Sequence, residues 1–185
     1  MITAIVVFVI IVLILVLMYN SLVNKKNQVE NIFASVDTQL KKRYDLIPNL
    51  IASVKEYMAH EEKVLDNVTG LRSQAIRHNL PENEIIALDA KMSSALGSLM
   101  IAVEAYPDLK ANENVLQLQA SLNEVEEQIQ AARRAYNQAV TDYNNAIEMI
   151  PSNLMAKAMG YIKKDVFSIQ ETQKENINVR ELFDK

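Results

Sequence analysis

The first nineteen residues, MITAIVVFVIIVLILVLMY, contain no charged side chain, no glycine and no proline. The hydrocarbon core of a bilayer is about 30 Å thick, and a helix of roughly 20 apolar residues crosses it. The segment therefore has the length and composition of one transmembrane helix. No lysine or arginine precedes it and no small-x-small cleavage site follows it, so it differs from a typical secretory signal peptide.

Positive charge flanks this segment on one side only. Lys25 and Lys26 follow it, and further basic residues lie at positions 41–43, whereas only the amino terminus precedes it. Because positive residues mark the cytoplasmic side of a membrane helix, we expect the N-terminus outside and the rest of the chain in the cytoplasm. The absence of cysteine is compatible with a reducing compartment, and also with an extracytoplasmic domain without disulfides.

Composition beyond the anchor predicts an all-α protein. Ala, Leu, Gln, Glu, Asn and Lys dominate, with little alternation of β-branched residues. The chain has a net charge of −4 with both signs interspersed, which argues against a nucleic-acid partner.

Apolar residues recur every three or four positions from Val29 to Ala75, which predicts one long helix over residues 20–78. Pro48 lies inside this pattern. Proline cannot donate to the carbonyl of Tyr44, so we expect a kink in a continuous helix. Alternatively, Asp45 caps a new helix at this point.

Turn signals divide the remainder of the chain. The segment 78–83 predicts a turn before a second helix over 85–103, which ends before Pro107. Asn112 is a plausible cap for a third helix that Pro151 closes. Ser152 or Asn153 is expected to cap a short fourth helix around 154–161. These signals predict three parts: an anchor over 1–19, a helical domain over 20–161, and a C-terminal tail over 162–185 that is a weak helix or mobile.

Several stretches of this sequence resemble the LemA family of bacterial membrane proteins. The most specific are RYDLIPNL and EAYPDLKANE, and PSNLMA also matches. The resemblance covers about residues 19–160 together with the anchor. It implies a single span in the bacterial inner membrane followed by an antiparallel four-helix bundle. One group of relatives, in magnetosome-forming bacteria, is linked to building membrane compartments, which suggests a role in membrane organisation. A Trp often precedes the VDTQL stretch in the family, whereas Phe33 and Ala34 stand nearby here.

Side chains that could perform catalysis are scarce. The two histidines are His60 and His78, and di-iron bundles need Glu-x-x-His pairs. Tyr57 and Ala75 occupy the positions where those glutamates would stand. The three glycines are scattered, so no phosphate-binding loop is present. We therefore predict a protein that is not an enzyme and needs no metal or cofactor.

Polar residues within the predicted helices allow two interpretations. They are either inward groups that fix the register of the bundle, which we favour, or a groove for a peptide, a lipid headgroup or a neighbouring subunit. These residues are Asp37, Arg43, Asp45, Asn49, Glu104, Arg133, Asn137, Tyr143 and Asn144. The stretch Tyr106, Pro107, Asp108, Leu109 and Lys110 is expected to form a structured interhelical turn rather than a recognition loop.

Two functions agree with these features. The first is a membrane-anchored scaffold that self-associates through coiled-coil-like contacts between long helices and organises or shapes the bilayer. The second is an adaptor or accessory subunit for another membrane protein, such as a protease or transporter. The first predicts a homo-oligomer, and the second predicts a different membrane protein as the partner.

Overall fold

The computed structural model describes residues 1–77 and 80–167, and these residues form six helices and no strand. The predicted all-α class is therefore confirmed. The chain divides into two compact units. The first contains Met1–Leu46 and Gln117–Val166, and the second contains Ile47–Leu116 and takes in Phe167.

Helix α1 runs from Ile2 to Val54 without a break and contains Pro48. Its most apolar stretch has a mean hydropathy of 3.3 and is not buried by any other part of the protein. Asp45 lies within α1, where its carboxylate accepts a hydrogen bond from Lys41 at 3.1 Å. The alternative in which Asp45 begins a separate helix is therefore wrong.

The prediction of one helix from residue 20 to 78 is also wrong, because α1 ends at Val54 and α2 begins at Glu62. Met58 is fully buried in the connection, where its amide donates to the carbonyl of Val54. The amide of Glu61 donates in turn to the carbonyl of Met58. These short-range bonds keep the residue spacing of a helix, and the connection has no Gly or Pro. The apolar periodicity therefore continues through this turn, so periodicity alone does not show where α1 ends.

The second unit continues with α2 (Glu62–Ala75) and α3 (Glu82–Glu104), which pack against each other. By length and composition α3 could also cross a membrane. It nevertheless has a buried stripe that includes Asp89, as is typical of a core helix. The short helix α4 (Pro107–Lys110) precedes α5 (Glu113–Glu148). Asn112 caps α5 as predicted, because its Oδ1 accepts from the amides of residues 114 and 115 at 3.0 and 3.3 Å.

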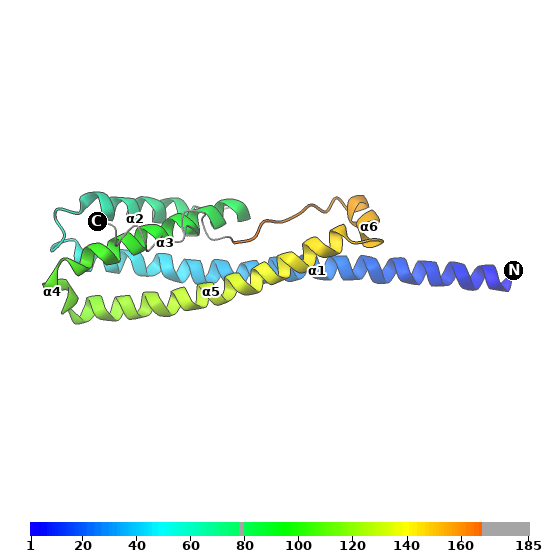
Figure 1. Ribbon diagram of the computed structural model, residues 1–185, viewed down its shortest axis with the longest axis horizontal. Coiled ribbons are helices and arrows are strands. Elements are labelled where there is room, and N and C mark those ends of the chain that lie inside the picture. Colours follow the sequence, from blue (N-terminus) through cyan, green and yellow to red (C-terminus); the bar gives the residue numbers. More distant parts are fainter. Residues whose placement is uncertain (78–79, 168–185) are drawn as a thin grey trace, which may run out of the picture. The chain divides into compact units, whose positions relative to one another are not determined.

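In the first unit, α5 runs antiparallel to α1 (Figure 1). Arg43 pairs with Glu126, and Phe33 contacts Tyr136 with ring centroids 5.4 Å apart. Residue numbers on α1 thus fall as those on α5 rise.

Helix α6 (Ser152–Ala158) follows a cis peptide bond between Ile150 and Pro151. The predicted capping of α6 by Ser152 or Asn153 is wrong, because no side chain caps this helix. The Ser152 hydroxyl instead donates to the carbonyls of Ala146 and Met149 at the end of α5, at 2.7 and 3.0 Å.

After Gly160, whose φ of 69° suits a residue without a Cβ, the chain leaves the helix. Residues 161–167 form neither helix nor strand, so the weak helix predicted for the tail is wrong there. Residues 168–185 of the predicted tail lie outside the described residues.

Candidate functional site

Five of the nine predicted polar residues are not members of the two clusters described below. Asn49 and Glu104 belong to the second unit, where both are exposed. In the first unit, Asp37 and Asp45 are exposed on α1, and Asn137 is half-buried on α5. The other four divide between two separate clusters, both in the first unit.

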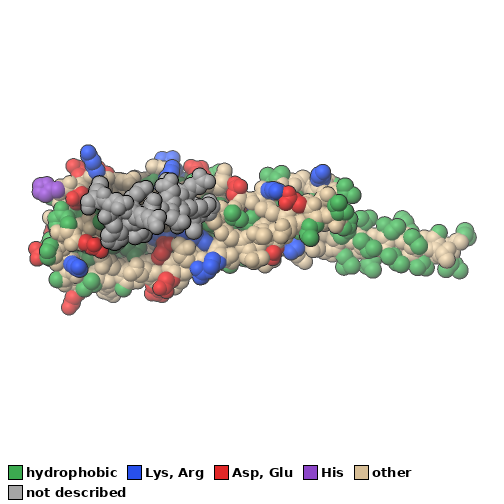
Figure 2. Space-filling model, in the orientation of Figure 1, with side chains coloured by type: hydrophobic (Ala, Val, Ile, Leu, Met, Phe, Trp, Pro, Cys, Tyr) green, Lys and Arg blue, Asp and Glu red, His purple; other side chains and the backbone are tan. Residues whose placement is uncertain are grey.

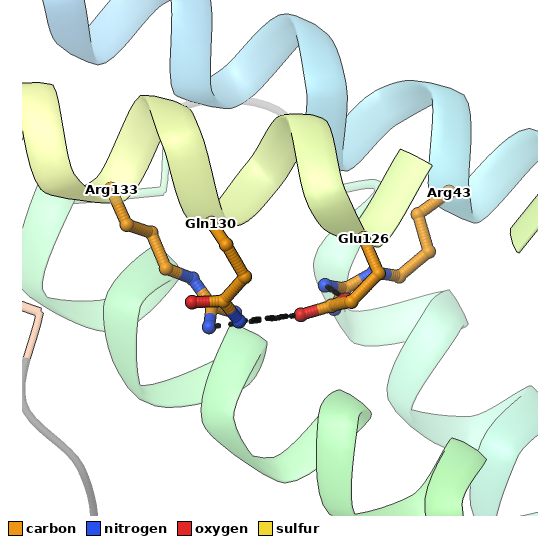
Figure 3. Close-up of polar contacts among 4 residues, drawn as sticks. All are labelled: Arg43, Glu126, Gln130 and Arg133. Carbon is orange, nitrogen blue, oxygen red and sulfur yellow. Dashed lines mark hydrogen bonds and ion pairs between the residues drawn. The ribbon is translucent and has the colours of Figure 1, made fainter. Parts of the chain in front are cut away.

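The first cluster, here called the carboxylate cluster, consists of Arg43, Glu126, Gln130 and Arg133 (Figure 3). Arg43 on α1 is 1% exposed, and its Nη2 donates to Oε2 of Glu126 on α5. Oε1 of the same carboxylate accepts from Nε2 of Gln130 at 2.6 Å and lies 4.0 Å from Nη1 of Arg133. One carboxylate therefore faces two guanidinium groups.

This arrangement can fix the axial position of α5 against α1. Arg43 lies one turn from Leu40 and Ile47, so it enters the apolar row of α1 where an aliphatic residue would otherwise stand. A buried guanidinium needs an anionic partner at a defined height, and sliding either helix by one turn would separate the two charges. The carboxylate cluster therefore supports the register interpretation.

Glu126 was not among the predicted residues. It stands next to Val125 in the apolar stripe and seven residues, or two turns, before Arg133. That spacing places both charges on one face of α5. Its pairing with Arg43, 83 residues earlier in the chain, depends on how α1 and α5 align, which periodicity alone does not give.

The second cluster holds the chain's own segment 161–164, here called the strap. The Tyr143 hydroxyl donates to the carbonyl of Ile162 at 3.0 Å, and its ring lies 5.9 Å from that of Tyr161. The Asn144 amide donates to the carbonyl of Lys164 at 2.9 Å and accepts from its backbone N–H at 3.0 Å. Asn144 therefore pairs with the strap as a neighbouring strand would.

Residues that we considered as part of a peptide groove thus bind a peptide segment of the same chain. Lys163 adds an ion pair to Glu148 at 2.6 Å, although both side chains are more than half exposed. Such a pair contributes little to stability. The hydrogen bonds from Tyr143 and Asn144 attach the strap to α5.

Burial raises the pKa of the Tyr143 phenol, and the nearby Tyr161 and Glu30 raise it further because both carry negative charge when ionised. An unfolded tyrosine ionises near pH 10. Above that pH the unfolded chain releases this proton before the folded protein does. The contribution of the buried phenol is therefore complete below about pH 10 and is lost as the pH rises through the higher folded value.

We predict that the free energy of unfolding falls more steeply above about pH 10 in the wild type than in Tyr143→Phe. The variant also loses the bond to Ile162, at a cost of about 1 kcal/mol at neutral pH. Urea unfolding followed by circular dichroism at several alkaline pH values measures both effects. The exposed Tyr57→Phe is the matched control and should follow the wild type. Equal slopes for Tyr143→Phe and wild type would refute the prediction.

The predicted interhelical turn lies in the second unit and contains α4. Leu109 is fully buried, Tyr106 is half-buried, and Pro107, Asp108 and Lys110 are exposed. One apolar side chain therefore anchors an otherwise solvated turn.

Within residues 1–77 and 80–167, no group of three or more His, Asp or Glu side chains could hold a metal ion. His60 is exposed, and His78 lies outside the described residues. The predicted absence of metals and cofactors stays a prediction.

Comparison with known proteins gives a family and three relatives. The sequence model described as the LemA family matches residues 32–180. Magnetosome proteins MamQ 1 and MamQ 2 of Paramagnetospirillum magneticum are each 22% identical to the chain over 178 residues, covering 83% of it and 65% of their own length. Magnetosome protein MamQ of Magnetospirillum gryphiswaldense is 21% identical with the same coverage. The chain thus spans about two thirds of the length of each relative.

Proposed function

The chain belongs to the LemA family, and from this premise we propose that it is a non-enzymatic, membrane-anchored helical scaffold that self-associates and organises the bacterial membrane. The observation that carries the proposal is the continuity of α1. One helix of 53 residues leads from the apolar anchor into the helical region without a linker. A continuous helix transmits position and orientation, whereas a flexible linker would uncouple the anchor from the rest of the chain.

Association with a membrane is supported by the apolar part of α1 and by the relatives, which are named as magnetosome proteins. We propose a single pass through the inner membrane by residues 1–19, with the C-terminal part in the cytoplasm because Lys25 and Lys26 follow the anchor. A C-terminal reporter active only outside the cytoplasm would reverse this orientation. Release of the protein from membranes by carbonate would exclude the anchor.

Self-association is proposed from the exposed face of α5. Gln128 bonds to Glu124 and Gln138 bonds to Asp142, each pair one turn apart at 3.2 and 2.9 Å. Long helices with ordered amide and acidic side chains beside apolar rows suit lateral contact between helices. The name of the relatives as magnetosome proteins agrees with a role at a membrane compartment.

The test is the mass of the full chain, purified in detergent, by size-exclusion chromatography with light scattering. A scaffold gives one assembly of many copies, and vesicles that carry it should change shape under the electron microscope. A monomer or dimer that co-purifies with a different membrane protein would instead support the adaptor function. A monomer that leaves vesicles unchanged would refute the scaffold.

A further inference from the structure

The corner between α5 and α6 exposes a group of large apolar side chains. We call this group the apolar foot: Met149, Ile150, Leu154 and Ile162 are 64%, 85%, 69% and 77% exposed. Single exposed apolar residues are common on protein surfaces, but a contiguous patch marks a surface that contacts another apolar phase.

One member of the apolar foot, Leu154, faces the membrane helix across a groove. A groove of about 360 Å³ separates α6 from α1, and its walls are Ile11, Ile14, Leu15 and Met18 on one side and Pro151, Leu154 and Met155 on the other. All these side chains are apolar. In Figure 2 the hydrophobic side chains of the N-terminal part of α1 continue onto the region of α6.

The position of the groove along α1 sets its depth. With a rise of 1.5 Å per residue, Ile11 and Met18 lie about 14 and 24 Å from Ile2 along the helix axis. Both positions fall within a hydrocarbon core about 30 Å thick. If α1 crosses the bilayer, the groove therefore runs from near the bilayer midplane at Ile11 toward the surface of the leaflet from which α1 emerges.

Lysines follow members of the apolar foot closely in the chain. Lys157 follows Leu154 by one turn and is exposed, and Lys163 and Lys164 come directly after Ile162. Apolar side chains with lysines at their edge are typical of segments that lie in the interface of a bilayer, because lysine can bury its stem and keep its ammonium among the headgroups.

We propose that the apolar foot inserts into the leaflet from which α1 emerges and that its groove holds a lipid acyl chain. The occupant is lipid because the α1 wall of the groove belongs to the anchor, which must itself face hydrocarbon. The inference rests on the membrane anchorage in the proposed function and is independent of self-association. It gives the chain a second attachment, at the end of α5, which would hold the first unit upright on the membrane.

The test uses the lack of native cysteine in the sequence. Leu154→Cys, Val7→Cys and Gln117→Cys are each labelled with nitrobenzoxadiazole and reconstituted as full chains in vesicles of phosphatidylcholine and phosphatidylglycerol. Val7 lies inside the anchor, three positions from its centre, and Gln117 is an exposed residue about 47 Å before the end of α5. Quenching is measured with spin-labelled lipids, shallow or deep, and with aqueous iodide.

We expect the Leu154 label to be quenched by spin-labelled lipids and shielded from iodide several-fold relative to the Gln117 label. The Val7 label should respond to deep spin labels. Ile150→Cys repeats the measurement at a second position of the apolar foot, in case one label disturbs packing.

Quenching at Val7 but at neither foot position would overturn the inference and leave the anchor intact. No lipid quenching at any position would overturn both. Shielding of the foot from iodide without lipid quenching would mean that protein, such as a second copy of the chain, covers it, and this result would also overturn the proposal.

Discussion

Glu126→Ala is expected to lower the free energy of unfolding by about 3 kcal/mol, whereas Arg43→Met should lower it by less than about 1 kcal/mol. The asymmetry follows from burial. Arg43 is 1% exposed, so water cannot take the place of the Glu126 carboxylate beside its guanidinium. Glu126 is 38% exposed, so a carboxylate that has lost Arg43 can still be hydrated. Methionine also fills much of the space left by the arginine stem.

Urea unfolding of each variant in the same detergent measures this difference. Asp45→Ala is the control, because the Lys41–Asp45 pair on the same helix is 74% and 58% exposed and should contribute less than about 0.5 kcal/mol. Arg43→Met costing as much as Glu126→Ala would contradict the argument. The hydrogen bonds of the guanidinium, rather than the desolvation of its charge, would then be the larger factor.

The comparison of Arg43→Met with Glu126→Ala also tests whether the Arg43–Glu126 pair fixes the alignment of α1 and α5, on which the proposed function depends. If Arg43→Met keeps its stability, the protein could have used an apolar residue at this position, so the charged pair is retained for specificity rather than strength. A scaffold needs each copy to present the same surface, which requires one alignment of α1 and α5. We therefore expect Arg43→Met to broaden the distribution of assembly sizes while the protein stays folded.

The sequence predicted the helices correctly where neighbouring residues determine the backbone conformation. The apolar run of α1 has only one reasonable conformation in a membrane, and Asn112 marks the start of α5 by a bond to its own neighbouring amides. The end of α1 was missed because the turn around Met58 keeps helical spacing. Ser152 was assigned to the wrong helix because a hydroxyl can bond backward as readily as forward.

The same distinction between local and long-range features applies to the candidate functional site. Arg43, Tyr143 and Asn144 could be identified because they are polar residues in apolar rows. Their partners could not be identified from the sequence. Glu126 is brought to Arg43 by the return of the chain along α5, and the strap is brought to Tyr143 and Asn144 by the turn of the chain through α6. Backbone atoms of residues 162 and 164 accept and donate these bonds, and a backbone group leaves no signature in the sequence.

Pro48→Ala is expected to raise the free energy of unfolding by about 1–2 kcal/mol. Proline costs about 3 kcal/mol relative to alanine inside a helix, and the restored N–H at position 48 would face the carbonyl of Tyr44. Part of this gain is offset because alanine gives the unfolded chain more conformational freedom. The Pro48 ring is exposed, so its removal leaves no cavity. Thermal and urea unfolding measure the change, with the exposed neighbour Asn49→Ala as control.

Assembly size then tests whether the proline serves the scaffold. Pro48 weakens its own helix, yet α1 continues through it without a break. Its clearest use is therefore to set the direction that α1 follows. We expect Pro48→Ala to melt no lower than the wild type and yet to elute with a different mass by light scattering, while Asn49→Ala elutes as wild type. Unchanged mass would separate the proline from assembly and weaken the scaffold proposal. A large loss of stability would contradict the continuous helix, because only a proline that terminates a helix would be better than alanine at this position.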